Sequence, residues 1–304
     1  MAWQEALDLL VHQNMPELDY IKDEPMSRHT TFRIGGTAAR MAFPQTQEEL
    51  ITLYQSALDC GVTPLVIGNG SNLLVCDEGI DRLIICTAKC LHQITRDSDQ
   101  IIAESGILLS QLASFAQKNA LTGLEFAHGI PGTLGGAICM NAGAYGGEMK
   151  DVVRSVTVFD PQSGIRTFSG EEMQFHYRGS LLSEHPEFTV LYVVLQLAPG
   201  NAEEIEATMS DLMERRKAKQ PYDKPSAGST FKRPEGYFAG GLIEECGLKG
   251  ARVGGAEVSQ KHAGFVINTG VATAKDVMQL IEKIQKTVFE AHGVMLEPEI
   301  KIIR

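Results

Sequence analysis

The chain has 304 residues, of which 43% are hydrophobic and 21% charged, and its formal net charge is −11 with a pI near 5.2. That length is enough for two domains with packed cores, and the composition is that of an ordinary globular protein. The acidic balance disfavours a nucleic-acid binder, and no apolar run reaches the roughly 18–20 residues that a membrane helix needs. The N-terminus lacks the basic-then-apolar pattern of a secretory signal. We therefore expect a cytoplasmic protein that binds neither nucleic acid nor membrane.

The cysteines do not have the Cys-x-x-Cys spacing of a zinc or redox site. We expect reduced thiols, most of them buried, and no bound metal. The six cysteines are Cys60, Cys76, Cys86, Cys90, Cys139 and Cys246.

Apolar periodicity in the first quarter of the chain predicts a βαβ lobe. A short N-terminal helix over residues 3–11 precedes a strand over 31–43, which has a glycine turn inside it. Thr46-Gln-Glu-Glu has the pattern of a capping box, and apolar residues then repeat at helical spacing up to Gly61, a residue typical just after a helix end. A strand over 64–67 completes the lobe.

The middle of the chain reads as a second α+β lobe. The elements expected there are strands over 83–86 and 101–104, a helix with Leu109, Leu112, Ala113, Phe115 and Ala116 on its apolar face, a strand, turn and strand over 152–168, and a strand over 188–197.

A helix capped by Asn201 and ending in basic residues 215–219 contains the expected domain boundary, near residue 210. Beyond it we expect a helix over 239–246, a strand over 264–268, a helix over 273–292 and a strand over 295–303. The buried stripe of the long helix is Val277, Leu280, Ile281, Ile284 and Val288. The predicted parts are 1–210, with lobes 1–75 and 76–210, and 211–304.

Two glycine-rich loops interrupt these elements. Residues 129–147 hold seven glycines, a density that costs conformational entropy and so needs a reason. One reason is close approach of backbone N–H groups to phosphate oxygens; the alternative is a purely structural cluster of tight turns.

The other loop, over residues 68–72, lies between two apolar runs. A dinucleotide fingerprint requires a helix after its glycines, whereas residues 73–76 look extended, so we reject a Rossmann fold. Two such loops in one chain favour a nucleotide-sized ligand.

The motifs over 66–74, 123–136 and 140–143, together with His29-Thr-Thr-Phe-Arg-Ile-Gly-Gly, resemble those of the UDP-N-acetylenolpyruvoylglucosamine reductase family. The resemblance extends from about residue 29 to the C-terminus. It implies an α+β fold, with a two-lobed FAD-binding part of the PCMH type and a smaller C-terminal α+β substrate domain. It also implies reduction of UDP-N-acetylglucosamine enolpyruvate to UDP-N-acetylmuramate for peptidoglycan, with NADPH as co-substrate.

By this resemblance, backbone N–H groups of both glycine loops hold the FAD pyrophosphate. The first loop has no histidine that would tether the flavin covalently, so we expect dissociable FAD. The chain has no long insertion between residues 178 and 200, which indicates the shorter subclass of the family. The cofactor-binding residues implied are Gly68, Asn69, Gly70, Ser71, Asn72, Leu73, Gly129, Ile130, Pro131, Gly132, Gly135, Gly136, Asn141, Gly143 and Ala144.

Three residues match the catalytic motifs of the family. Ser229 lies in an Ala-Gly-Ser-x-Phe pattern and would protonate the substrate α-carbon; Arg178 lies in Tyr-Arg-x-Ser, and a planar guanidinium suits a carboxylate or enolate. Glu299, the second glutamate of Leu-Glu-Pro-Glu, would be the catalytic acid, and strand alternation would place Glu297, Glu299 and Lys301 on one face. Without the resemblance, these residues would read as a turn serine, a solvated arginine and an edge-strand charge.

The resemblance also implies substrate contacts by Tyr177, Lys219, Lys232 and Arg233. Lys219 is otherwise one charge of a basic helix end, and Arg233 stands where the family usually has asparagine. We expect a monomer whose active site forms where its domains meet. The alternatives are a flavin oxidase of the same fold and a non-catalytic flavin or nucleotide binder; the intact motifs around Ser229, Arg178 and Glu299 argue against both.

Overall fold

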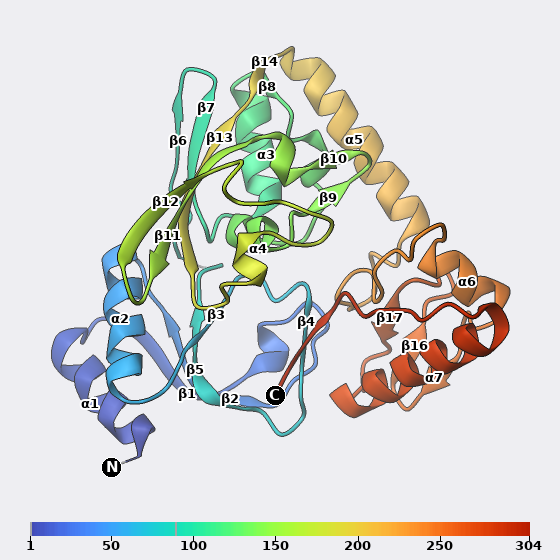
Figure 1. Cartoon of the computed structure of the whole chain (residues 1–304), viewed down its shortest axis with the longest axis horizontal. Helices are drawn as coiled ribbons and strands as arrows, with labels where there is room; N and C mark the ends of the chain where they lie inside the picture. Colours follow the sequence, from blue (N-terminus) through green and yellow to red (C-terminus); the bar gives the residue numbers. More distant parts are fainter. Residues whose placement is uncertain (1, 89) are drawn as a thin grey trace. The chain divides into compact units, whose positions relative to one another are not determined.

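The computed structural model describes residues 2–88 and 90–304. Helices and strands mix along the chain, which confirms the predicted α+β class (Figure 1). The chain divides into two compact units, each built from three segments. Unit 1 comprises Met1–Lys22, Arg40–Asn69 and Arg82–Glu214, and unit 2 comprises Asp23–Ala39, Gly70–Asp81 and Arg215–Arg304.

The first sheet has the strand order β1-β2-β5-β3, with β3 and β5 parallel. Its strands are β1 (Asp19–Pro25), β2 (Thr37–Phe43), β3 (Leu65–Ile67) and β5 (Ile80–Cys86). Helices α1 (Trp3–Asn14) and α2 (Gln47–Asp59) share a hydrophobic core with Leu83 and Ile85 of β5. Thr46 caps α2 by accepting a hydrogen bond from Glu49 N at 3.1 Å, and Gly61 follows the helix end with φ +79°, as the sequence predicts.

The second sheet belongs to unit 1, has five strands in the order β12-β11-β13-β7-β6, and is antiparallel throughout. Its strands are β6 (Ile94–Asp97), β7 (Gln100–Glu104), β11 (Val153–Asp160), β12 (Gly164–Ser169) and β13 (Thr189–Gln196). Buried residues of α3 (Leu109–Lys118), α4 (Leu134–Cys139) and the first half of α5 (Ala202–Lys219) share one core with these strands. Asn201 Oδ1 accepts from Glu203 N and Glu204 N, which confirms the predicted cap of α5.

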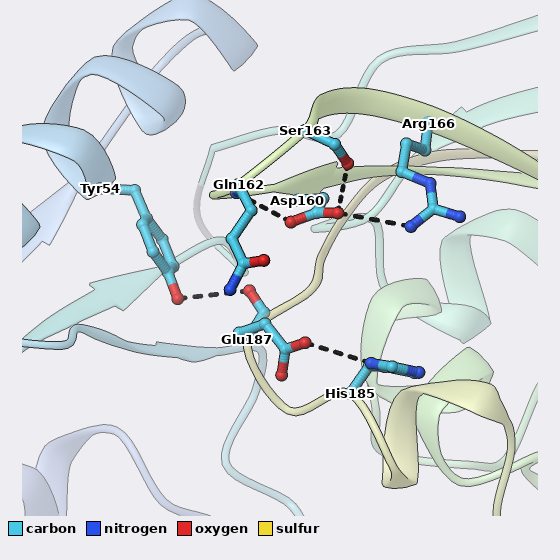
Figure 2. A network of polar contacts seen from close by, with 7 residues as sticks. All are labelled: Tyr54, Asp160, Gln162, Ser163, Arg166, His185 and Glu187. Atoms are coloured by element: carbon cyan, nitrogen blue, oxygen red, sulfur yellow. Dashed lines mark hydrogen bonds and ion pairs between the residues drawn. The ribbon is translucent and has the colours of Figure 1, made fainter.

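The turn between β11 and β12 is closed by Asp160, as the Asp-Pro-Gln-Ser-Gly sequence predicts (Figure 2). Its carboxylate accepts from Gln162 N at 2.9 Å and from Ser163 Oγ, and Arg166 Nη1 lies 3.4 Å away. These hydrogen bonds, that of Ser163 foremost, lower the pKa of Asp160.

Unit 2 packs α6 (Ala239–Glu245) and α7 (Ala274–His292) on a small antiparallel sheet. The sheet has the order β15-β16-β17, with β15 (Arg252–Val253), β16 (Ala256–Val258) and β17 (Val266–Asn268). All five predicted stripe residues of α7 are buried in its core, which also contains Phe32, Ile34 and Leu74. The C-terminal strand β18 (Lys301–Ile303) lies parallel to β4 (Leu73–Val75), as Figure 1 shows.

Some expected elements differ in the structure. The strand expected over 31–43 begins only at Thr37, because Arg33 and Gly35 have positive φ angles of 54° and 137° that interrupt an extended chain. The last strand covers Lys301–Ile303 alone, so the strand expected over 295–303 was too long, and the shared face of Glu297, Glu299 and Lys301 stays a prediction. The second glycine stretch also contains the short helix α4, which was not predicted.

All six cysteines are free thiols, but only Cys76, Cys86 and Cys90 are buried; the other three are partly exposed. None of the described helices is both long and apolar enough to cross a bilayer. Unit 2 begins its last segment inside α5, near the expected boundary, and also takes in residues 23–39 and 70–81. The assignment of 1–210 to FAD and 211–304 to substrate stays a prediction.

Candidate cofactor and active site

In unit 1 the start of the first glycine loop, Gly68 and Asn69, lies directly beside the second glycine stretch. Asn69 Nδ2 donates to Pro131 O at 2.6 Å. A Cβ on Gly68 would lie 2.0 Å from Thr133 Oγ1, closer than any real contact, so only glycine fits there. The start of the first loop and the second glycine stretch therefore form one backbone surface.

Three side-chain atoms beside this surface are buried without a hydrogen-bond partner in the described part of the chain: Ser105 Oγ, His128 Nδ1 and Thr133 Oγ1. Ser105 also packs on Gly135, whose N donates to Ser105 O at 2.8 Å. Burial lowers the pKa of His128, which favours its neutral form. Buried polar groups are normally paired, so unpaired atoms gathered at a glycine-rich surface fit a bound ligand with polar atoms, as FAD has. No motif or pattern in the sequence pointed to Ser105.

The far end of the second stretch is a tight hairpin. Strands β9 (Gly143–Ala144) and β10 (Gly147–Glu148) pair across Tyr145 and Gly146, whose φ angles are 54° and 91°. Positive φ at both central residues is the pattern of a type I′ turn. Gly143 is needed because a Cβ there would lie 2.7 Å from Glu148 Cγ.

Arg178 occupies an unusual turn in unit 1. The backbones of His176 and Gly179 bond to each other in both directions, at 3.0 and 3.2 Å, with Tyr177 and Arg178 between them. Arg178 has φ +57°, a left-handed conformation that costs a non-glycine residue of order 1–3 kcal/mol. Its guanidinium lies 5.1 Å from the centre of the exposed Tyr177 ring. Ser180, fully buried, donates to Cys139 O at 3.3 Å and so fastens this motif to the end of α4.

In unit 2 the segments that contain Ser229 and Glu299 run side by side. Glu299 N donates to Thr230 O at 2.8 Å, and Phe231 and Pro298 form an isolated antiparallel β-bridge. Ser229 is exposed and Glu299 half-buried. The structure thus brings together, within one unit, two of the three residues matched to catalytic motifs.

Asn72 of the first glycine loop lies at the same place in unit 2. Its Nδ2 donates to Glu299 O at 3.0 Å, and Lys301 N donates to its carbonyl at 2.9 Å. Gly70, with φ +58°, lies against the backbone of His29, and Leu73 begins β4, which pairs with the C-terminal strand. Residues 70–73, which are expected to bind the cofactor, therefore lie directly beside Glu299, the proposed catalytic acid, within unit 2.

The residues expected to bind substrate lie on the surface. Lys232 Nζ pairs with Glu297 Oε1 at 2.5 Å, and the guanidinium of Arg233 lies 4.0 Å from the centre of the Phe238 ring. Lys219 is exposed at the end of α5. The substrate contacts of these side chains stay predictions.

Comparison with known proteins covers nearly the whole chain. Residues 38–169 match the FAD binding domain family, and residues 220–303 match the C-terminal domain of UDP-N-acetylenolpyruvoylglucosamine reductase. Among curated proteins, the UDP-N-acetylenolpyruvoylglucosamine reductase of Caldanaerobacter subterraneus subsp. tengcongensis is 54% identical over 92% of each chain. That of Clostridioides difficile is 49% identical, again over 92% of each.

A crystal structure of the same reductase from Thermus caldophilus is 36% identical, with a TM-score of 0.80, and the match covers 95% of this chain and 99% of that one. These matches confirm the predicted fold class, with its FAD-binding part and its C-terminal domain. The chain belongs to the UDP-N-acetylenolpyruvoylglucosamine reductase family.

Proposed function

We propose that this oxidoreductase reduces UDP-N-acetylglucosamine enolpyruvate to UDP-N-acetylmuramate, a step of peptidoglycan precursor synthesis, with FAD as cofactor and NADPH as co-substrate. Family membership supports the reaction class. The observation that carries the assignment of roles is the hydrogen bond from Glu299 N to Thr230 O, which sets Ser229 and Glu299 on neighbouring segments beside Asn72.

The backbone surface of the two glycine loops is the proposed seat of non-covalently bound FAD. Unpaired hydroxyls of Ser105 and Thr133 are available to polar atoms of the cofactor, and Gly68 keeps the loops close enough to face it together. When bound, FAD supplies hydride transfer from NADPH to the substrate.

The protein's own groups manage charge and protons on the substrate. A hydride added to the β-carbon leaves negative charge shared with the substrate carboxylate. Arg178 is suited to hold that carboxylate through two parallel hydrogen bonds, and Ser229 gives a proton to the α-carbon. Glu299 either donates a proton itself or orients the donor. Lys219 and Lys232 add positive charge for the anionic substrate.

Replacing Ser229 by alanine tests the proton-donor role. Anaerobic flavin bleaching by NADPH should stay near the wild-type rate, whereas recovery of flavin colour on adding the enolpyruvyl substrate should slow by about 10²–10⁴-fold, the usual contribution of a general acid. Stopped-flow absorbance measures both half-reactions.

The matched control is Ser226→Ala, in the same segment, where the hydroxyl has no proposed role; both half-reactions should be unchanged. Equal loss in both half-reactions of Ser229→Ala would contradict the proton-donor role. A purified protein that is colourless and binds no FAD would overturn the cofactor assignment as well.

A further inference from the structure

Asn141 joins the end of the second glycine stretch to the turn that carries Arg178. Its Nδ2 donates to His176 O at 3.1 Å and to Glu148 Oε2 at 2.8 Å, while its Oδ1 accepts from Lys150 N at 3.0 Å. The residue is 1% exposed, so water does not compete for these bonds. Because His176 O also accepts from Gly179 N, the amide of Asn141 supports the carbonyl that closes the turn.

Glu148 in turn fixes the orientation of Asn141. Its backbone is held by the β9–β10 hairpin and by a capping box with Asp151, so the side chain starts from a rigid position. Hydrogen bonding to Lys150 lowers the pKa of Glu148 most, burial opposes this, and the hydrogen bond from Asn141 and the charge of Arg178 lower it further. Glu148 is therefore a carboxylate near neutral pH, and its charge acts on the guanidinium of Arg178.

The turn needs such support because its backbone is strained. A turn with positive φ at its third residue normally takes glycine or asparagine there, but this one has Arg178. Gln174, just before the turn, also has a positive φ of 48°. Strained conformations persist where the surrounding contacts determine them, and Asn141 supplies one such contact.

We infer that Glu148 is a positioning residue for Arg178: it orients Asn141, which braces the turn, and its carboxylate attracts the guanidinium. This inference rests on the proposed function of Arg178. It means that one chain of contacts runs from the glycine stretch proposed for the cofactor to the arginine proposed for the substrate, all inside unit 1.

The test is a double-mutant cycle of Glu148→Gln and Arg178→Gln in the FAD-loaded enzyme, with the two half-reactions measured separately. At position 148 glutamine keeps an acceptor for Asn141 but removes the charge. Glu148→Gln alone should slow the substrate half-reaction about tenfold and leave flavin bleaching by NADPH unchanged, and it should have no further effect in the Arg178→Gln background, which has no positive charge for the carboxylate to attract. Glu171→Gln, an exposed glutamate of the same unit with the same loss of charge, should change neither half-reaction.

Other outcomes separate this inference from the proposed function. If Arg178→Gln slows the substrate half-reaction but Glu148→Gln does not, or if their effects multiply, Glu148 does not act through Arg178. Equal slowing of both half-reactions by Glu148→Gln would indicate a general structural role and also overturn the inference. If Arg178→Gln has no effect, the role of Arg178 itself fails. Should Glu148→Gln not fold, Glu148→Asp, which keeps the charge but shortens the reach to Asn141, replaces it in the same cycle.

Discussion

A family motif in the sequence identifies Arg178 as a candidate, but it does not show how the backbone at Arg178 is held in place. The motif predicted its identity and chemistry, but not its left-handed backbone or its support by Asn141. These depend on contacts between segments about 35 residues apart, which single-sequence patterns do not encode. The same limit hid Ser105, whose unpaired hydroxyl lies by the second glycine stretch only because Gly135 packs on it. Ser229 and Glu299 are candidates on the family motifs alone, and their catalytic roles stay predictions.

At the residue scale, Gly68 allows the sharpest test of the backbone surface. Gly68→Ala places a Cβ 2.0 Å from Thr133 Oγ1, so the loops must separate. We expect FAD affinity to fall at least about tenfold while the fold is retained. Displaced loop N–H groups would make longer and weaker hydrogen bonds to the FAD pyrophosphate. Flavin fluorescence titration measures the Kd.

In a Thr133→Ala background, Gly68→Ala should weaken FAD binding less than it does in the wild type. Removal of Oγ1 leaves Thr133 Cβ as the nearest atom, at 3.1 Å, which a small shift relieves. If Gly68→Ala weakens binding equally in both backgrounds, the loss has a cause other than this clash.

At the element scale, the sequence predicted best where periodicity and capping agree. Helix α7 has both a five-residue buried stripe and a Thr273–Asp276 capping box, and α2 has the Thr46 cap. Helix α4 was missed because its six residues include two glycines, which weaken any helical pattern. The strands β15 and β16 are two and three residues long, too short for alternation to show.

The hairpin between β11 and β12 provides a prediction at this scale. Asp160 holds the turn through Gln162 N and Ser163 Oγ and lies beside Arg166 (Figure 2). Asp160→Ala removes a buried acceptor whose donors lie on exposed residues, where water can partly replace it, so unfolding free energy should fall by about 1 kcal/mol. Urea denaturation measures the change.

Asp97 provides the control, since it is an exposed aspartate at the end of β6, next to the β6–β7 turn. Asp97→Ala should cost less than about 0.5 kcal/mol, as exposed substitutions usually do. Equal effects of the two substitutions would mean that the hydrogen bonds of Asp160 do not stabilise the hairpin.

At the scale of the whole molecule, neither unit is continuous in sequence. Unit 2 combines the C-terminal segment with residues 23–39 and 70–81, so its core needs Phe32 and Leu74 from early in the chain. Domain boundaries predicted from sequence alone fall at single positions along the chain. Local patterns carry no information on which distant segments pack together. The parallel pairing of β18 with β4, in which Lys301 lies opposite Leu73, could not be predicted for the same reason.

The stability of the whole chain should depend on pH through Asp8. Its carboxylate accepts from Arg40 Nε at 2.6 Å and Nη2 at 2.8 Å, from Lys22 Nζ at 2.6 Å and from Tyr20 Oη at 2.9 Å. These bonds, that of Arg40 foremost, hold the pKa of Asp8 well below its ordinary value of 3.8, although burial opposes them. A depressed folded pKa adds stability that is complete above the unfolded pKa and is lost as pH falls toward the folded one.

Asp8→Asn should therefore lower unfolding free energy by about 2 kcal/mol at pH 7, where the carboxylate binds two cations. Below about pH 4 the gap between wild type and variant should narrow steadily, because an unfolded wild-type chain then takes up a proton that the folded chain resists. Urea denaturation at pH 7, 5, 4 and 3 follows the gap, with Asp19→Asn, an exposed aspartate of the same unit, as the control. If the difference in unfolding free energy between wild type and Asp8→Asn stays constant down to pH 3, the charge of Asp8 contributes nothing to stability. The lower stability of the variant would then come only from changed hydrogen bonds.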